Sequence, residues 1–231
     1  MNMALQKQIL GRSDRKKQKT RTDLLNTAYR LMSKDGVDET TIAEISELSD
    51  VAFGTFYNYF KSKDEIAACV LDGVIKDLGE RLAEATKHLR ETDPAAAQAV
   101  STRIVLREMI TSPMWRSWLK KTDLLVERMT VGFYDYAKRN TMLAIQAGDY
   151  NLDEKDVDTA HSQHTWMMVG GVKSILDEQA TGVDENKVVE GVLCSKGLPR
   201  ERARELTALP LPKISPHQID FSCPEKVPEY S

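Results

Sequence analysis

Residues 40–66 read TTIAEISELSDVAFGTFYNYFKSKDEI, and the order of signals in this stretch decides the fold. Thr41 and Glu44 form a capping box, in which the threonine hydroxyl accepts from a first-turn amide and the glutamate reaches back to the cap amide. Apolar residues at helical spacing then give this short helix an inner face: Ile42, Ile45 and Leu48. A helix therefore begins just after Thr41 and is brief.

The chain turns directly after this helix and begins another one. Asp50 tolerates the left-handed backbone region better than most residues, which favours a tight turn at 49–51. We expect a third helix over 52–59, with Phe56 and Phe60 facing inward because they lie four residues apart. A second capping box at 62–65 predicts a long fourth helix that continues to about residue 89. Two short helices around one tight turn are typical of a helix-turn-helix.

An amphipathic helix precedes this pair. Its apolar residues fall on one helical face: Leu24, Leu25, Ala28, Leu31 and Met32. Gly36 is expected to end the helix, because glycine adopts the left-handed conformation without steric cost. The three helices together predict a compact N-terminal domain over 20–66.

The spaced signals of 20–66 resemble the DNA-binding domain of the TetR family of transcriptional regulators. The resemblance rests on Gly36, the Thr40-Thr41 pair, the aromatic third helix and the Ser-Lys opening of the fourth. This chain departs from the family where the turn usually has glycine and the third helix usually has a serine cap, since it has Asp50 and Ala52 there. Phe53 also stands where the family often has a basic or small residue, so base contacts cannot be carried over from a relative.

In a helix-turn-helix the second helix of the pair lies in the major groove and presents its side chains to base edges. The residues predicted to contact DNA from this element are Phe53, Gly54, Thr55, Tyr57, Asn58 and Tyr59. Asn58 offers the paired donor and acceptor that suit adenine, and Phe53 suits a thymine methyl. Thr41 and Lys63 lie at helix N-termini, which favour phosphate. The resemblance also implies phosphate contacts at the positions of Tyr57, Tyr59 and Lys63.

The N-terminal arm is strongly basic, although the whole chain is not. The 231 residues contain 32 Lys and Arg against 35 Asp and Glu, which gives a formal net charge of −3. Within 1–21, seven basic residues oppose one acidic residue, a local net charge of +6. Four of these bases are expected to follow the DNA backbone or enter the minor groove: Lys16, Lys17, Lys19 and Arg21. The charge balance argues against a uniformly basic nucleic-acid coat.

The rest of the chain has helical periodicity and no strand pattern. Beyond the fourth helix, further helices are expected over 95–110, 113–147, 153–179, 184–194 and 200–208. Five prolines predict an extended tail over 209–231. The predicted fold is therefore all-α, with a basic arm (1–19), a helix-turn-helix domain (20–66), a helical effector-binding and dimerisation domain (67–208) and a proline-rich tail (209–231).

The helical body offers residues suited to a ligand and to a partner. Aromatic and methionine side chains of its middle helices suit an apolar effector cavity: Trp115, Trp118, Met129, Phe133, Tyr136, Trp166 and Met167. Arg103, Arg107 and Arg128 are candidates for meeting a carboxylate of the effector. Gly170, Gly171 and Ser174 lie on one side of their helix and permit the close approach of another helix. The resemblance implies an effector pocket in the body and a four-helix interface between two copies.

Catalytic and metal-binding motifs give only weak signals. Ser117 and Lys120 fit S-x-x-K, but no companion motif accompanies them. His161 and His164 lie one helical turn apart without further ligands at metal-binding spacing. Three widely spaced cysteines favour reduced thiols over disulfides. We therefore expect no enzyme activity, no metal and no cofactor.

The sequence predicts a cytoplasmic homodimer that binds a palindromic double-stranded DNA operator and represses transcription until a small apolar or amphipathic effector releases it. No stretch reaches the ~20 apolar residues of a membrane span, so no membrane partner is expected. Two alternatives stay open. One is an architectural or chromosome-associated protein that uses the same fold without an effector, and the other is an enzyme built on the helical body.

Overall fold

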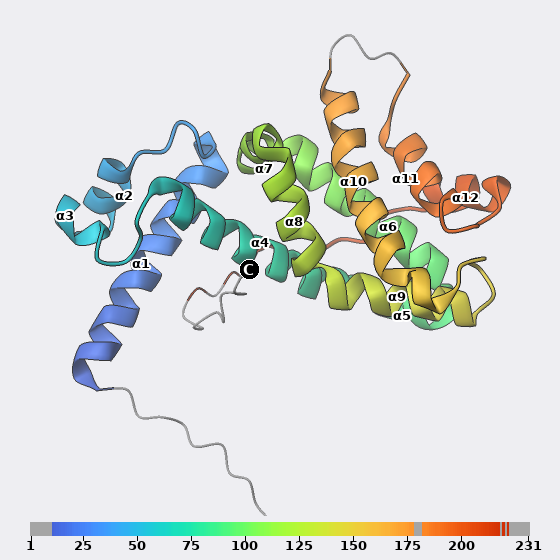
Figure 1. Ribbon diagram of the computed structural model, residues 1–231, viewed down its shortest axis with the longest axis horizontal. Helices are drawn as coiled ribbons and strands as arrows, with labels where there is room; N and C mark the ends of the chain where they lie inside the picture. The colour runs from blue at the N-terminus through green and yellow to red at the C-terminus, as the bar shows by residue number, and fades with distance from the viewer. Residues whose placement is uncertain (1–10, 178–181, 218, 220, 222–231) are drawn as a thin grey trace, which may run out of the picture.

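The fold is all-α, as the sequence predicts. The computed structural model describes residues 11–177, 182–217, 219 and 221. Within these residues the chain forms twelve α-helices and two short 3-10 helices, with no β-strand. Figure 1 shows a small lobe, which we call the head, and a larger helical lobe, which we call the body, joined along α4. No helix in the described part of the chain is long and apolar enough to cross a membrane.

The head consists of α1 (Arg12–Asp35), α2 (Ile42–Leu48), α3 (Phe53–Phe56) and the start of α4 (Lys63–Ala85). α1 packs against both α2 and α4, and α2 packs against α3. The head is closed by fully buried side chains from all of these helices: Leu24, Leu25, Met32, Ile45, Phe56, Phe60 and Ile66. The helical faces inferred from apolar spacing are thus the faces that meet in the core.

The local signals of the head act as predicted. The Thr41 hydroxyl accepts from the Glu44 amide at 3.2 Å, and the Glu44 carboxylate accepts from the Thr41 amide at 2.9 Å. Asp50 has a φ of 54°, which places it in the left-handed region that the turn requires. Gly36 ends α1 with a φ of 90°. The capping box and both turns are therefore confirmed.

Two details of the head differ from the prediction. α3 is a single turn, shorter than the expected 52–59, because Ala52 supplies no side-chain cap and the residues after Phe56 form turns. At the start of α4, Ser62 Oγ accepts from the Glu65 amide at 3.1 Å, but the Glu65 carboxylate accepts from the Lys61 amide instead of from the cap. The second capping box is therefore only half formed.

α1 begins eight residues before the predicted boundary at residue 20. No proline or glycine interrupts the chain between Arg12 and Asp35, so a helix that forms over 20–35 continues backward. The basic residues after Arg12 therefore lie on the first turns of α1, which extend past the head in Figure 1. Residues 1–10 of the predicted arm lie outside the described residues.

The body is organised around α6 (Pro94–Thr111), in which nearly every side chain over 94–106 is buried. The surrounding helices are α5 (Lys87–Thr92), α7 (Pro113–Trp118), α8 (Thr122–Gly132), α9 (Tyr134–Gln146), α10 (Val157–Leu176), α11 (Glu185–Cys194) and α12 (Arg200–Thr207), with the 3-10 turns η1 (Leu119–Lys121) and η2 (Glu154–Asp156). Of these, α5, α7, α9, α10, α11 and α12 all contact α6. α4 joins head and body, because its later turns pack against α8.

Three predicted helices are divided or shortened. The expected helix over 113–147 consists of α7, η1, α8 and α9, and the break at Phe133 follows Gly132, where a side chain would collide with Ile75 of α4. The fourth helix ends at Ala85, where Thr86 separates it from α5. α10 begins at Val157, four residues after the expected start, and the expected end at residue 179 lies outside the described residues.

The described part of the tail is extended, as predicted, and it packs back onto the protein. Arg81 of α4 donates to the Ser215 carbonyl at 3.0 Å, and the Thr22 hydroxyl of α1 donates to the Phe221 carbonyl at 3.2 Å. The Phe221 ring lies against Gly73, where an added Cβ would stand 2.5 Å from it. The tail therefore crosses from the body to the head instead of leaving the fold.

Candidate nucleic-acid interface and effector cavity

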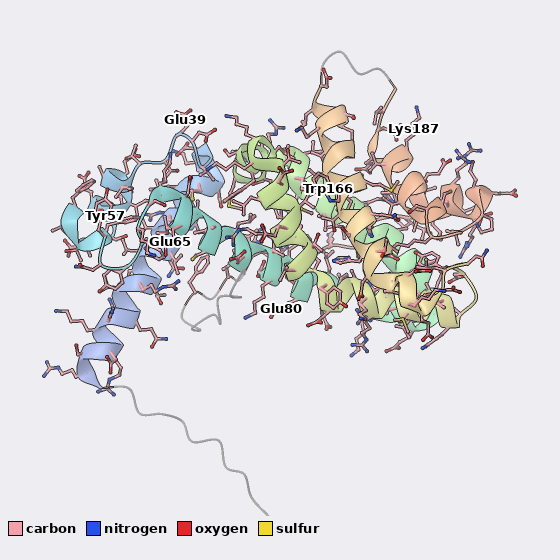
Figure 2. All side chains as sticks on the ribbon, in the orientation of Figure 1. Glu39, Tyr57, Glu65, Glu80, Trp166 and Lys187 are labelled. Carbon is pink, nitrogen blue, oxygen red and sulfur yellow. The ribbon has the colours of Figure 1, made fainter. Side chains whose placement is uncertain are left out.

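The outer surface of α3 and of the turn that follows it, which we call the α3 surface, carries two exposed aromatic side chains. Phe53 is 54% exposed and Tyr57 is 49% exposed, and their ring centroids lie 5.7 Å apart in an edge-to-face arrangement. Figure 2 shows Tyr57 at the end of the molecule farthest from the body. Phe56 and Phe60 are buried, as predicted. Large exposed aromatics beside a well-filled core indicate a surface that meets a partner.

The other residues predicted on this element are also accessible to different degrees. No atom lies within 4 Å of the place where a Cβ on Gly54 would stand, so a partner's backbone can come close there. Asn58 is exposed, while Thr55 and Tyr59 are half-buried. The structure thus brings Gly54 and Asn58 to the same surface as Phe53 and Tyr57. Thr55 and Tyr59 are partly buried against the head.

The two candidate phosphate contacts at helix N-termini are partly engaged within the head. The Thr41 hydroxyl is exposed and contacts the Glu44 carboxylate at 2.7 Å. Lys63 Nζ donates to the Asp38 carbonyl at 2.9 Å, which holds its ammonium group beside the loop between α1 and α2. Phosphate binding by Lys63 would therefore take place next to this loop.

The four basic candidates on α1 have different surroundings. Lys16 and Lys17 are exposed on the first turns. Lys19 pairs with Asp23 at 3.1 Å. Arg21 is half-buried, with its guanidinium carbon 5.1 Å from the centroid of the Phe60 ring. Lys16 and Lys17 are consequently the better placed to meet a phosphate backbone, and Arg21 belongs to the packing of the head.

The S-x-x-K motif attaches the head to the body. The Val37 amide donates to Ser117 Oγ at 3.1 Å, and Lys120 pairs with Asp38 at 2.5 Å. This bond to Lys120 is the main cause that lowers the pKa of Asp38 below its usual value. Gly36 is needed at this junction, because an added Cβ would stand 2.8 Å from Ser117 Oγ. Both motif residues thus have a structural role between domains.

A cavity of about 40 Å³ lies inside the body. Its wall is contributed by α4, α6, α8, α9 and α10 and comprises Leu82, Gln98, Ser101, Thr102, Val105, Met129, Phe133, Tyr136, Ala137, Asn140, His161, His164, Thr165 and Met168. Leu82 is the contribution of α4, the helix that begins in the head. A small molecule in this cavity would therefore contact the helix whose first turns form part of the head.

Only three of the predicted effector residues line this cavity: Met129, Phe133 and Tyr136. Trp115 and Trp118 are buried in the core around α7 and do not reach it. Trp166 is 47% exposed and Met167 is 36% exposed, and Figure 2 shows Trp166 on α10. Helical periodicity shows which residues share a face of a helix but not which face another helix covers, so these four residues do not meet at this cavity.

The three predicted arginines are paired within the chain and do not line the cavity. Arg103 and Arg107 both bind Glu185 of α11, at 3.3 Å and 2.6 Å. These bonds, chiefly that to Arg107, lower the pKa of Glu185. Arg128 binds Asp72 of α4 at 2.5 Å, although burial is strong enough to raise the pKa of that carboxyl. The structure therefore places these arginines in contacts between helices.

A buried polar network behind the cavity was not anticipated. Tyr150 OH donates to Gln98 Oε1 at 2.7 Å, and Gln98 Nε2 lies 3.4 Å from His164 Nδ1. Lys196, only 1% exposed, reaches the same nitrogen at 3.3 Å, and burial lowers its pKa to about 7. The Thr102 hydroxyl donates its hydrogen to the Gln98 backbone carbonyl. It therefore accepts a hydrogen bond from His164 Nε2 at 3.2 Å. The network is complete with His164 neutral.

Two further histidine and tyrosine contacts complete the polar wall. Tyr136 OH lies 2.6 Å from Ser101 Oγ and 3.0 Å from Thr86 Oγ1, which joins α9 to α6 and to the end of α4. His161 Nε2 lies 2.8 Å from the Thr130 carbonyl. The described residues contain no cluster of three His, Cys, Asp or Glu side chains that could hold a metal ion. These polar side chains are far apart in the sequence, so only the tertiary structure shows that they form one site.

The predicted interface glycines face different neighbours. Gly170 is exposed, and no atom lies within 4 Å of an added Cβ. At Gly171 an added Cβ would stand 2.6 Å from Val188 of α11 in the same chain. Gly171 therefore permits the close approach of α10 and α11 within one copy, and Ser174 is half-buried nearby. Of the three, Gly170 has the surface open to a second copy.

Comparisons with known proteins agree with this architecture. A family model described as bacterial regulatory proteins of the tetR family matches residues 24–70. The chain is 31% identical over 102 residues to the HTH-type transcriptional regulator TtgR of Pseudomonas putida, which covers 44% of this chain and 48% of that protein. It is 26% identical over 92 residues to the HTH-type transcriptional repressor KstR2 of Rhodococcus jostii, covering 40% of each. The chain spans half or less of the length of these curated relatives.

The similarity to solved structures extends over the body as well. The crystal structure of RolR in complex with resorcinol matches with a TM-score of 0.79 and 25% identity, over 87% of this chain and 100% of that chain. SmeT, the repressor of the Stenotrophomonas maltophilia multidrug efflux pump SmeDEF, matches with a TM-score of 0.53 and 19% identity, over 76% of this chain and 87% of that chain. The second match shows the fold alone.

Proposed function

Since this chain belongs to the TetR family of bacterial regulatory proteins, we propose that it binds a specific palindromic DNA operator as a homodimer in the cytoplasm. We further propose that it acts as a repressor and that a small molecule in the body cavity releases it from DNA. The observation that supports DNA binding most strongly is the exposed surface of α3. Phe53, Tyr57 and Asn58 are presented there while Phe56 and Phe60 anchor the helix from below.

This surface suits the major groove in both shape and chemistry. The open side of Gly54 lets the helix approach the DNA, and Asn58 can read an adenine through its paired donor and acceptor. Tyr57 and Lys63 are proposed to hold phosphates, with Lys63 standing at the start of α4. Lys16 and Lys17 on the projecting turns of α1 would add attraction that does not depend on sequence.

A dimer places two such heads on one operator. The exposed face of α10 around Trp166, Met167 and Gly170 is the surface we propose for the contact between copies. A two-fold dimer reads half-sites about 34–36 Å apart, one turn of DNA, or a multiple of this distance. A small change in the separation of the heads therefore lowers affinity for the operator.

The small volume of the cavity suggests how effector binding changes the DNA-binding head. A cavity of about 150 Å³ accommodates a ligand the size of benzene, whereas this one measures about 40 Å³. An aromatic effector must therefore displace parts of the wall, which includes Leu82 of α4 and Tyr136, whose hydroxyl contacts Thr86 at the end of α4. Displacing them moves the end of α4, whose other end lies in the head. The similarity to the RolR complex with resorcinol, at 25% identity, supports a small-molecule ligand for this chain as well.

The two alternatives make different predictions. An architectural protein would bind specific and random DNA with similar affinity, whereas a repressor discriminates between them. An enzyme would need a convergent set of titratable groups in the cavity, whereas no Asp, Glu, Lys, Arg or Cys of the described chain lines it beside His161 and His164. We therefore propose a binding function without catalysis.

Selection of bound sequences from random DNA tests the proposal directly. The full chain should enrich a palindrome, and its affinity for this palindrome should exceed that for scrambled DNA by at least about a hundredfold at roughly 150 mM salt. Equal affinities would favour the architectural alternative. Release of the palindrome by a small molecule that leaves the protein dimeric would establish the effector step.

A further inference from the structure

Two residues that line the cavity each have a buried polar atom that no group of the described protein satisfies. Asn140 Oδ1 and His161 Nδ1 have no hydrogen-bond partner, and their residues are 1% and 5% exposed. Both residues line the cavity. Buried polar groups in proteins are nearly always paired, so two unpaired ones in the wall of the same cavity call for an explanation.

The hydrogen bond at Nε2 determines which ring nitrogen of His161 carries the hydrogen. A carbonyl oxygen can only accept, so the 2.8 Å contact with the Thr130 carbonyl requires the hydrogen on Nε2. Burial lowers the pKa of His161, which keeps the ring neutral. Nδ1 therefore carries a lone pair and acts as an acceptor. Asn140 Oδ1 is an acceptor as well.

The remaining polar groups of the wall are already occupied. Gln98, Thr102 and His164 belong to the network that ends at Lys196. Ser101 and Tyr136 bond to each other. Thr165 donates to the His161 carbonyl of its own helix. The unpaired acceptors of Asn140 and His161, together with the amide donor group of Asn140, are thus what the wall offers a ligand, and the other lining side chains are apolar.

Charged ligands are disfavoured by this arrangement. No Asp, Glu, Lys or Arg of the described chain lines the cavity, so neither sign of charge has a partner at the wall. A carboxylate would face the two lone pairs, and the neutral amide donor of Asn140 cannot balance its charge. A cation would lie near the buried ammonium of Lys196, which bonds to the back of His164. A neutral molecule avoids both costs.

We propose that this cavity selects neutral, mainly apolar ligands that carry two hydroxyl or amino donors, one bonded to Asn140 Oδ1 and the other to His161 Nδ1. This rests on the proposed effector function and specifies the ligand class for it. The apolar skeleton of the ligand packs against Leu82, Val105 and Met168, and its two donors satisfy the acceptors that the protein leaves unpaired.

Calorimetric titration of the full-length wild-type protein with a graded series of probes tests the proposal. The series comprises the three benzenediols, phenol, 1,3-dimethoxybenzene, benzoate and anilinium. One of the diols should bind best, phenol about tenfold more weakly, and dimethoxybenzene about tenfold more weakly again, because each missing donor leaves a buried acceptor unpaired. Tighter binding of dimethoxybenzene or of benzoate than of every diol would overturn the proposal.

Two variants assign the acceptors. In Asn140→Leu, which keeps the size of the side chain, the advantage of the best diol over phenol should fall from about tenfold to less than about twofold. Asn186→Leu is the matched control, since this exposed asparagine of α11 does not line the cavity, and the advantage should persist there. An unchanged advantage in Asn140→Leu contradicts the assignment. If that variant does not fold, the wild-type series still decides.

DNA binding is measured separately on the same preparations. Probes that bind in the expected order without releasing the operator would support the ligand class and refute the effector function. A protein that binds and releases its operator with another molecule but none of the probes would refute the ligand class alone.

Discussion

The Val37 amide, between α1 and α2 of the head, donates a 3.1 Å hydrogen bond to Ser117 Oγ of α7 in the body. The same hydroxyl donates to the Pro113 carbonyl at 3.1 Å. Ser117 Oγ is therefore fixed by its own helix while it accepts the hydrogen bond from the head. With the Lys120–Asp38 pair beside it, this bond is a second connection between head and body, apart from α4. A change in the body can therefore reach the head through this junction as well as through α4 and the tail.

Replacing this hydroxyl should loosen the junction. Ser117→Ala leaves the Val37 amide without its acceptor, which should lower the free energy of unfolding by about 1 kcal/mol. Thr92→Ala is the control, because that hydroxyl donates only to the His88 carbonyl one turn earlier in α5. Chemical denaturation of both variants measures the difference. Equal stability of the two would mean that the contact between Val37 and Ser117 carries no net energy.

The α3 surface should separate affinity from base preference. Tyr57→Ala should weaken binding to operator and scrambled DNA alike, whereas Asn58→Ala should reduce operator affinity by about 1–3 kcal/mol and leave scrambled DNA unaffected. Glu80→Ala, on the exposed side of α4, is the control. Fluorescence anisotropy on both DNA duplexes measures this. Wild-type binding by both folded α3 variants would place the interface elsewhere.

The first turns of α1 should contribute to the dependence of binding on salt. Neutralising Lys16 and Lys17 to Gln should make the slope of log affinity against log salt shallower by about 0.9 for each phosphate that these lysines neutralise in the wild-type complex. The same change at Lys87 and Lys155, which lie on the body, should leave the slope unchanged. If the slopes of the two double variants coincide, the α1 lysines do not contact DNA.

The buried lysine should make stability depend on pH. Lys196 has a pKa of about 7 in the folded protein against 10.5 as the ordinary value, so between these values the unfolded chain binds more protons. The free energy of unfolding should therefore rise by about 1.4 kcal/mol per pH unit from about pH 7 toward about pH 10 on account of this residue. Lys196→Met should flatten the rise, as measured by denaturation at several pH values. A persistent slope in the variant would assign it to another group.

The dimer surface should distinguish the two adjacent glycines of α10. Gly170→Leu adds a side chain to an open surface and should yield folded monomers with weak operator binding. Gly171→Leu instead collides with Val188 of its own chain and should lower the melting temperature. Light scattering and thermal denaturation compare the two, with Gly170→Ala as a milder control. A Gly170→Leu protein that remains dimeric with full operator affinity would move the interface to another face.

Local signals in the sequence determined the head. Capping at Thr41, the left-handed turn at Asp50 and the end of α1 at Gly36 depend on residues within a few positions of one another. Apolar spacing also identified the inward faces, which is why Phe56 and Phe60 were correctly placed in the core. Three cavity residues, Met129, Phe133 and Tyr136, followed from their apolar and aromatic character.

Contacts between distant segments decided the rest. Arg103 and Glu185 are separated by 82 positions, and nothing near either residue indicates that the guanidinium is neutralised by α11 instead of being left for a ligand. The pairing of Lys196 with His164 and the role of Ser117 at the junction have the same origin. Periodicity shows which residues share a helix face, but the packing of helices determines what that face meets. That packing is why Trp166 lies on the surface while Asn140 and His161, each with an unpaired buried acceptor, line a cavity.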